Sequence, residues 1–376
     1  MNDAYKELLA TCKSVISNPM AYVAEWKSRN PGKKAVGFLP TYVPLEPIYA
    51  AGGLPVGLWG SDIPVAVADA YIQQFTCSLV RSVTEEAFTG MYDGLDAVLF
   101  PPICDSLKLV GSSWDLNLSG KFLVEFANLP ERLDGAAAGT YLEAELRRVS
   151  KRINGESIED RHFPQAIALV NRLRESMAGF CTWRSAHPVP FADVAAILKA
   201  ATVLHADEYR TLVDKVLSVA SAPAEPVHAI PIVVTGLSCQ LPHPEMMRCF
   251  DEAGLSVVAD DLFLGLRGTP AVEENGNPYA NIAKSYCKSA PMAIRHTEHA
   301  KRHEQILEQI ERNRAKGIVF MVPKFCEPEW FDLRYLQEEI RQRRIPNIVL
   351  DFEEGLGATG SLQTRLSAFA ETLSLR

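Results

Sequence analysis

Short apolar runs alternate with amphipathic helical stretches in two separate parts of this chain, and this alternation limits the folds that it can form. The first part spans residues 35–126 and the second spans residues 229–351. Strands that are separated by helices need crossover connections, so they pair in parallel and place helices on both faces of the sheet. We therefore predict an α/β fold with two doubly wound parallel-sheet (Rossmann-like) domains.

Each predicted strand is a mostly apolar run bounded by turn residues or by a helical pattern. The predicted strands are 35–40, 54–60, 97–100, 123–126, 229–236, 255–261, 317–322 and 346–351.

The stretch between the two alternating parts has helical periodicity and no convincing strand. We predict an N-terminal helix plus α/β domain at 1–128, a helical segment at 129–226 and a C-terminal α/β domain at 227–376. A linker is predicted at 221–226. The apolar stripes of the helical segment predict a partner interface there.

Composition excludes several classes of protein. The chain has 376 residues, 47% hydrophobic and 22% charged, with a formal net charge of -8. That charge argues against nucleic-acid binding, and no apolar run is long enough to span a membrane. The first residues lack the apolar core of a secretory signal, so we predict a cytoplasmic protein. Eight cysteines in such a protein indicate reduced thiols or metal ligands.

Two predicted strands are followed by the same order of residue types: proline, cysteine, an acidic residue and a helix. Cys104 follows the strand 97–100, and Cys326 follows the strand 317–322. Cys77 also stands at a helix start. Helix N-termini favour thiolates, and three such cysteines predict a soft-metal or iron–sulfur site. Their spacing matches neither a zinc pair nor a ferredoxin run, so buried structural cysteines remain an alternative.

Two motifs for other cofactors are absent from the sequence. It contains neither a G-x-x-x-x-G-K-[ST] phosphate loop nor a G-x-G-x-x-G dinucleotide loop after the first strand. We therefore expect neither ATP hydrolysis by this chain nor a nicotinamide cofactor. The pair Gly52-Gly53 is predicted to end a helix.

Other polar residues have two interpretations each. Glu46, after the first strand, is a candidate acid or base, or a helix N-terminal carboxylate. The pair Asp260-Asp261 faces a ligand or caps a helix. The histidines His296, His299 and His303 bind zinc or, as the surrounding charges favour, lie on a solvated face. The remaining cysteines are predicted to be buried or without a role, with Cys239 the least certain: Cys12, Cys181, Cys239, Cys249 and Cys287.

Several of these phrases together resemble the 2-hydroxyacyl-CoA dehydratase / benzoyl-CoA reductase superfamily. The resemblance covers nearly the whole chain. The phrases that carry it are 37–46, 50–56, Pro101-Pro102-Ile103-Cys104-Asp105, Lys324-Phe325-Cys326-Glu327-Pro328-Glu329 and 364–369, with Cys77 at the place of that family's first cysteine.

The resemblance implies a cofactor and partners. In that family three cysteines hold an iron–sulfur cluster between two α/β domains, so it implies that Cys77, Cys104 and Cys326 bind one [4Fe-4S] cluster. It also implies an oxygen-sensitive enzyme subunit that acts on an acyl-CoA with a homologous larger cluster-bearing subunit. A separate ATP-hydrolysing iron–sulfur component would deliver low-potential electrons.

Three functions remain open from the sequence. The sequences of these motifs are most similar to those of the smaller subunit of an ATP-dependent benzoyl-CoA reductase. A β-type subunit of a 2-hydroxyacyl-CoA dehydratase is the alternative within that family, and a non-enzymatic protein with a structural zinc is the alternative outside it. Where that family has two adjacent glutamates, this chain has Leu45 and Glu46, which leaves only Glu46 as a candidate acid.

Overall fold

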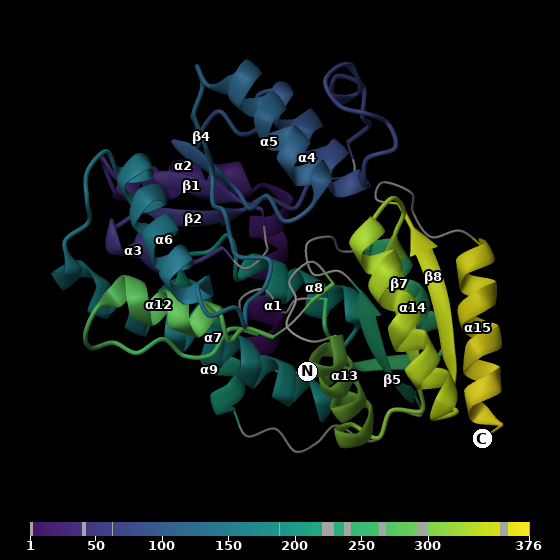
Figure 1. Cartoon of the computed structure of the whole chain (residues 1–376). Helices are drawn as coiled ribbons and strands as arrows, with labels where there is room; N and C mark the ends of the chain where they lie inside the picture. The colour runs from purple at the N-terminus through teal and green to yellow at the C-terminus, as the bar shows by residue number, and fades with distance from the viewer. Residues whose placement is uncertain are drawn as a thin grey trace.

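Two four-stranded sheets, all of whose strands run parallel, form the framework of the chain (Figure 1). The computed structural model describes residues 3–39, 43–61, 63–187, 189–219, 229–236, 242–262, 268–290, 292–293, 299–353 and 360–375. The strands are β1 (Ala35–Phe38), β2 (Leu54–Gly57), β3 (Ala97–Phe100), β4 (Leu123–Phe126), β5 (Ile230–Gly236), β6 (Leu255–Asp260), β7 (Gly317–Pro323) and β8 (Asn347–Phe352). The predicted α/β fold with two parallel sheets is confirmed.

The two sheets have the same strand order. The N-terminal sheet runs β2-β1-β3-β4 and the C-terminal sheet runs β6-β5-β7-β8. In each sheet the chain leaves the first strand on one side, returns past it and continues on the other side. Such an order creates a crevice between the carboxyl ends of the first and third strands, where open α/β sheets bind ligands.

Helices connect the strands and fill the space between the sheets (Figure 1). They are α1 (Asp3–Ser17), α2 (Pro19–Arg29), α3 (Glu46–Ala50), η1 (Ala68–Ala70), α4 (Ser78–Phe88), α5 (Asp105–Leu118), α6 (Ala138–Asn154), η2 (Asp160–His162), α7 (Phe163–Ser185), α8 (Phe191–Ala200), α9 (Ala206–Ser218), α10 (Pro244–Glu252), α12 (Pro278–Tyr286), α13 (His299–Arg312), α14 (Glu327–Gln342) and α15 (Gly360–Ser374).

The middle of the chain is helical, as predicted, and its apolar stripes are covered within the chain. Helix α7 packs against α3, α9 and β6, while α8 packs against α1 and α10. Ile167, Val170 and Leu173 of α7 are fully buried. The premise that these stripes need a partner is therefore wrong, although the division into segments 1–128, 129–226 and 227–376 stays a prediction. The predicted linker 221–226 lies outside the described residues.

The α-helix α12 lies in a stretch for which the sequence predicted neither a helix nor a strand. Helix α12 begins after Asn277, whose side chain accepts a hydrogen bond from the backbone N–H of Ala280 at 3.3 Å. Pro278 occupies its first position, where a missing N–H costs nothing. The helix packs against α6 and so joins the C-terminal part of the chain to the middle segment.

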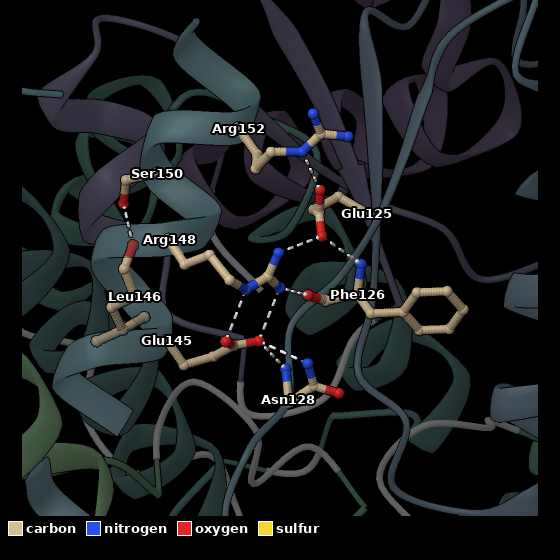
Figure 2. A network of polar contacts seen from close by, with 8 residues as sticks. All are labelled: Glu125, Phe126, Asn128, Glu145, Leu146, Arg148, Ser150 and Arg152. Carbon is tan, nitrogen blue, oxygen red and sulfur yellow. Dashed lines mark hydrogen bonds and ion pairs between the residues drawn. The ribbon is translucent and has the colours of Figure 1, made fainter. Parts of the chain in front are cut away.

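A polar network fastens α6 to the end of β4 (Figure 2). Glu125 accepts hydrogen bonds from Arg148 Nη1 at 2.8 Å and from Arg152 Nε at 2.9 Å. Arg148 also donates to Glu145 Oε2 at 2.8 Å. The backbone N–H of Asn128 donates to Glu145 at 2.8 Å, so the strand end and the helix share partners.

A helix that spans a bilayer must be both long and predominantly apolar. Among the described residues, none forms a helix that meets both conditions.

Candidate metal centre

Cys104 and Cys326 lie at equivalent places in the two sheets. Cys104 follows β3 and precedes α5, while Cys326 follows β7 and precedes α14. Strands β3 and β7 each neighbour the first strand of their sheet, so both cysteines stand at the crevice created by the strand order. A buried proline marks the strand end in both cases: Pro101 directly follows β3, and Pro323 is the last residue of β7. A proline offers no N–H donor to continue a ladder.

Cys77 reaches the same region from another loop. It is the N-cap of α4, and the N–H of Arg81 donates to its carbonyl at 3.2 Å. Glu85 of α4 holds the preceding loop by accepting from the N–H groups of Ala66 and Ala68 at 3.0 and 2.8 Å. The sequence places a thiol at each of three helix starts, and the fold turns all three toward one region.

Cys77 and Cys104 both lie within electrostatic range of Cys326. Burial, the charge of Glu329 and the charges of Cys77 and Cys104 together raise the pKa of Cys326 well above its usual range. Among the described residues, no three His, Cys, Asp or Glu side chains are close enough together to hold a metal ion as they stand. Cys77 and Cys104 thus act on Cys326 electrostatically, but the three thiols do not form a ready set of metal ligands in the described structure.

An ion-pair chain joins the two halves of the protein beside these cysteines. Arg81 of α4 lies 3.7 Å from Glu353, which follows β8, and Glu353 lies 3.7 Å from Lys324. Arg81 also binds Asp69 at 3.0 Å. All these side chains are partly exposed, so their energetic contribution is small. Because Arg81 lies in the helix that Cys77 starts and Lys324 lies just before Cys326, these two cysteines lie where the two α/β halves meet.

Protonation differs from the sequence expectation of thiolates. Burial raises the pKa of Cys104, and the N–H groups of Leu107 and Ser106, which lower it, do not offset the burial. The pKa of Cys326 is raised further by its acidic and thiol neighbours. Without a cation the two thiols are therefore protonated at neutral pH. Cys326 is buried, Cys77 and Cys104 are partly buried, and the charges of these two disfavour the anion of Cys326. Such sulfur donors suit a cationic metal centre, because metal charge displaces thiol protons.

Comparison with known proteins identifies the family. Residues 40–373 match the family model described as 2-hydroxyglutaryl-CoA dehydratase, D-component. The chain belongs to this family.

Curated relatives of the chain are subunits of two kinds of enzyme. A benzoyl-CoA reductase subunit of Thauera aromatica is 26% identical over 381 residues, covering 98% of both chains. The (R)-2-hydroxyglutaryl-CoA dehydratase subunit beta of Acidaminococcus fermentans is 28% identical over 382 residues, covering 98% of this chain and 100% of the relative. The (R)-phenyllactyl-CoA dehydratase beta subunit of Clostridium sporogenes is 26% identical over 373 residues, covering 96% of this chain and 97% of the relative. This member of the dehydratase and reductase family is therefore an enzymatic subunit.

Glu46 lies fully buried in an ion pair. Its Oε1 accepts from Arg174 Nη2 at 2.6 Å, and its Oε2 accepts from the Tyr286 hydroxyl at 3.1 Å. Arg174 Nη2 also donates to the Tyr286 hydroxyl at 2.8 Å. These three residues come from α3, α7 and α12, so the contacts tie all three segments of the chain together. Both carboxylate oxygens have partners in this state, and a role for Glu46 in catalysis stays a prediction.

The other acidic candidates are also paired. Asp260 binds Arg184, and Asp261 binds Arg302 at 3.1 Å. Asp261 also accepts from the N–H of Gly236 at 2.8 Å. These aspartates thus secure the ends of β5 and β6 in the described structure.

The histidine prediction is wrong where it can be checked. His303 is 5% exposed, with its Nδ1 2.9 Å from Glu339, so it does not lie on a solvated face. His296 and the side chain of His299 lie outside the described residues. Gly52 does end α3, with a left-handed φ of 71° that favours glycine.

The remaining cysteines give a mixed result. Cys12 and Cys249 are buried, as predicted, and Cys181 and Cys287 are partly buried. No disulfide links the cysteines of the described residues. Cys239 lies outside the described residues.

Proposed function

We propose that this chain is the smaller cluster-bearing subunit of an ATP-driven aromatic acyl-CoA reductase of the benzoyl-CoA reductase type. In this proposal Cys77, Cys104 and Cys326 hold one [4Fe-4S] cluster. The observation that carries it is the convergence of three thiols from both halves of the chain, two of them at equivalent crevices. Sulfur donors of this kind select iron–sulfur clusters or other soft metals.

A bound cluster of this type would supply an electron of low potential for reduction of the acyl-CoA. The chain's own residues would set its surroundings. Cys326 is 6% exposed, and apolar residues of the core pack around all three cysteines. Burial of this kind lowers the potential of a cluster and excludes water. Since three cysteines leave one iron position open, a ligand other than cysteine would complete the cluster.

We infer that the chain works only with partners. Its sequence contains neither the phosphate loop of an ATPase nor the dinucleotide loop of a nicotinamide enzyme. The relatives are named as subunits, which supports assembly with partner subunits. In this proposal the partners are a homologous larger cluster-bearing subunit and an ATP-hydrolysing iron–sulfur electron donor. Phe325, next to Cys326, and Phe331, in the second turn of α14, are 48% and 74% exposed. Exposed aromatic side chains beside the cluster ligands support a protein partner on this side.

A second function is supported by the same comparisons. The relative with 28% identity is a 2-hydroxyglutaryl-CoA dehydratase subunit beta, and identities of 26–28% do not separate the two activities. A dehydratase subunit beta would use the same cysteines and the same kinds of partner. The two candidates differ in substrate and in whether the electron is consumed or returned.

The deciding experiment is anaerobic purification of the chain alone and together with its co-expressed partner subunits. Iron, zinc and acid-labile sulfide are measured first, and a chain with zinc but no sulfide contradicts the cluster. The complex is then assayed with ATP and reductant against benzoyl-CoA and several 2-hydroxyacyl-CoA esters. Ring reduction supports the reductase, whereas water elimination without net reduction supports the dehydratase.

A further inference from the structure

Arg302 of α13 is the centre of a buried charge cluster. Its side chain is 4% exposed. It binds the carboxylates of Asp261, Glu329 and Asp332, the first two at 3.1 and 3.0 Å. Its Nη2 also donates to the carbonyl of Gly236 at 3.1 Å. Each of the three guanidinium nitrogens therefore has at least one acceptor.

These partners belong to three elements that are distant in the sequence. Gly236 ends β5, and Asp261 directly follows β6. Glu329 and Asp332 lie in the first two turns of α14, the helix that Cys326 caps. One guanidinium thus fixes the start of α14 against the carboxyl ends of two strands of the C-terminal sheet.

The turn that presents Cys326 depends on the position of α14. The N–H of Cys326 donates to Pro323 at 3.2 Å, and the N–H of Trp330 donates to the carbonyl of Cys326 at 3.1 Å. Phe325 holds a left-handed φ of 62°, a strained conformation for a side chain of this size. A residue in a strained conformation persists only where neighbouring contacts hold it there. For Phe325, the neighbour on one side is α14, and Arg302 holds that helix in place.

The geometry of this charge cluster requires arginine. Three carboxylates buried around one cation are stable only when the cation meets them in fixed directions, and guanidinium offers five donors in a planar fork. Lysine keeps the charge but cannot reach three separate acidic groups and a carbonyl with the same geometry. The substitution Arg302→Lys therefore keeps the positive charge but removes the hydrogen-bond geometry that positions α14.

We propose that Arg302 is a positioning residue for Cys326, which it acts on by docking the start of α14 onto the ends of β5 and β6. The role in cluster binding rests on the proposed function. The placement of the thiol does not rest on it, so the test below uses the cluster-free chain as well as the loaded one.

The test is peptide-resolved alkylation of the cluster-free full chain by iodoacetamide, followed by mass spectrometry. In Arg302→Lys we expect the Cys326 thiol to react about tenfold faster, as ~1.4 kcal/mol of lost local stability would produce. Cys104, which is on the other sheet, should keep its wild-type rate. Arg174→Lys is the matched control, because Arg174 is 5% exposed and its polar partners, Glu46, Asn171 and Tyr286, all lie outside α14.

Asp332→Asn provides a second variant if the lysine variant does not fold, and it should also raise the rate at Cys326 alone. In the loaded chain, both variants should shift the electron paramagnetic resonance signal and speed iron loss to a chelator. The proposal would be overturned by an equal increase in the alkylation rates of Cys326 and Cys104, or by no change at Cys326. It would also be overturned if Arg174→Lys caused the same selective increase at Cys326. A chain that binds no cluster but shows the selective rate change would contradict the proposed function only.

Discussion

Cys104 and Cys326 are structural equivalents in two sheets of identical strand order. Each follows the third strand of its sheet, each precedes a helix, and the charge of Cys104 contributes to the raised pKa of Cys326. The repeated phrase of proline, cysteine and acidic residue is therefore the same structural position occurring twice. Cys77 breaks this symmetry, because it follows a loop held by Glu85 and not a strand.

The three cysteines should bind iron jointly. Alanine at Cys77, Cys104 or Cys326 should lower the affinity for the cluster by more than about tenfold, since loss of even an outer-shell partner has that effect. Iron and sulfide analysis with a visible spectrum measures it. Cys181→Ala is the control and should keep its iron. A Cys104→Ala chain with full iron content, or a Cys239→Ala chain without any, would contradict the three-ligand assignment.

Glu46 should contribute mainly to stability. Glu46→Gln leaves the buried guanidinium of Arg174 without its anion and should lower the free energy of unfolding by about 3–5 kcal/mol. Urea unfolding measures this, and Glu338→Gln, at an exposed ion pair, should show no measurable change.

Turnover of the assembled complex then separates the two roles of Glu46. Tyr286→Phe removes one hydrogen bond to Glu46 but leaves its charge in place. A proton-transfer role predicts that Glu46→Gln abolishes turnover while Tyr286→Phe retains it. A purely structural role predicts that activity follows stability in both variants.

The network of Figure 2 should make part of the stability depend on pH. Burial tends to raise the pKa of Glu145, but hydrogen bonds from Arg148 and Asn128 outweigh it, and the pKa is lowered from 4.5. A lowered pKa in the folded state means that the contribution is complete above 4.5 and is lost as the pH falls through the folded value. Glu145→Gln should therefore destabilise the chain at pH 7, and the difference from wild type should shrink toward pH 3. A difference that stays constant with pH would contradict this assignment.

Activity should require the partner subunits. The purified chain should be inert with ATP, because the sequence has no phosphate loop, and it should gain activity only with the larger subunit and the electron donor. Size-exclusion chromatography of the chain with and without the co-expressed subunit measures the pairing. A monomer that reduces an acyl-CoA with a chemical reductant faster than the complex does would overturn the partner requirement.

The sequence by itself determined the elements and the candidate ligands. Period-2 and period-3.6 patterns and proline stops are local properties, so they placed all eight described strands and the cysteines at three helix starts. The repeated motif around Cys104 and Cys326 could also be interpreted from the sequence, because it marks the same local transition from strand to helix in both places. The local pattern failed at α12, where only Asn277-Pro278 marks the start of the helix.

Only the tertiary structure decided which groups meet. The partners of Glu46, Arg174 and Tyr286, are 128 and 240 residues away, and no spacing rule relates them. Arg302 lies in a helix whose charge pattern indicates a solvated surface, yet it is buried among carboxylates from other elements. The raised pKa of Cys326 is likewise decided by burial, by Glu329 and by the two neighbouring thiols. Burial and pairing depend on distances through space, which the order of residues along the chain does not contain.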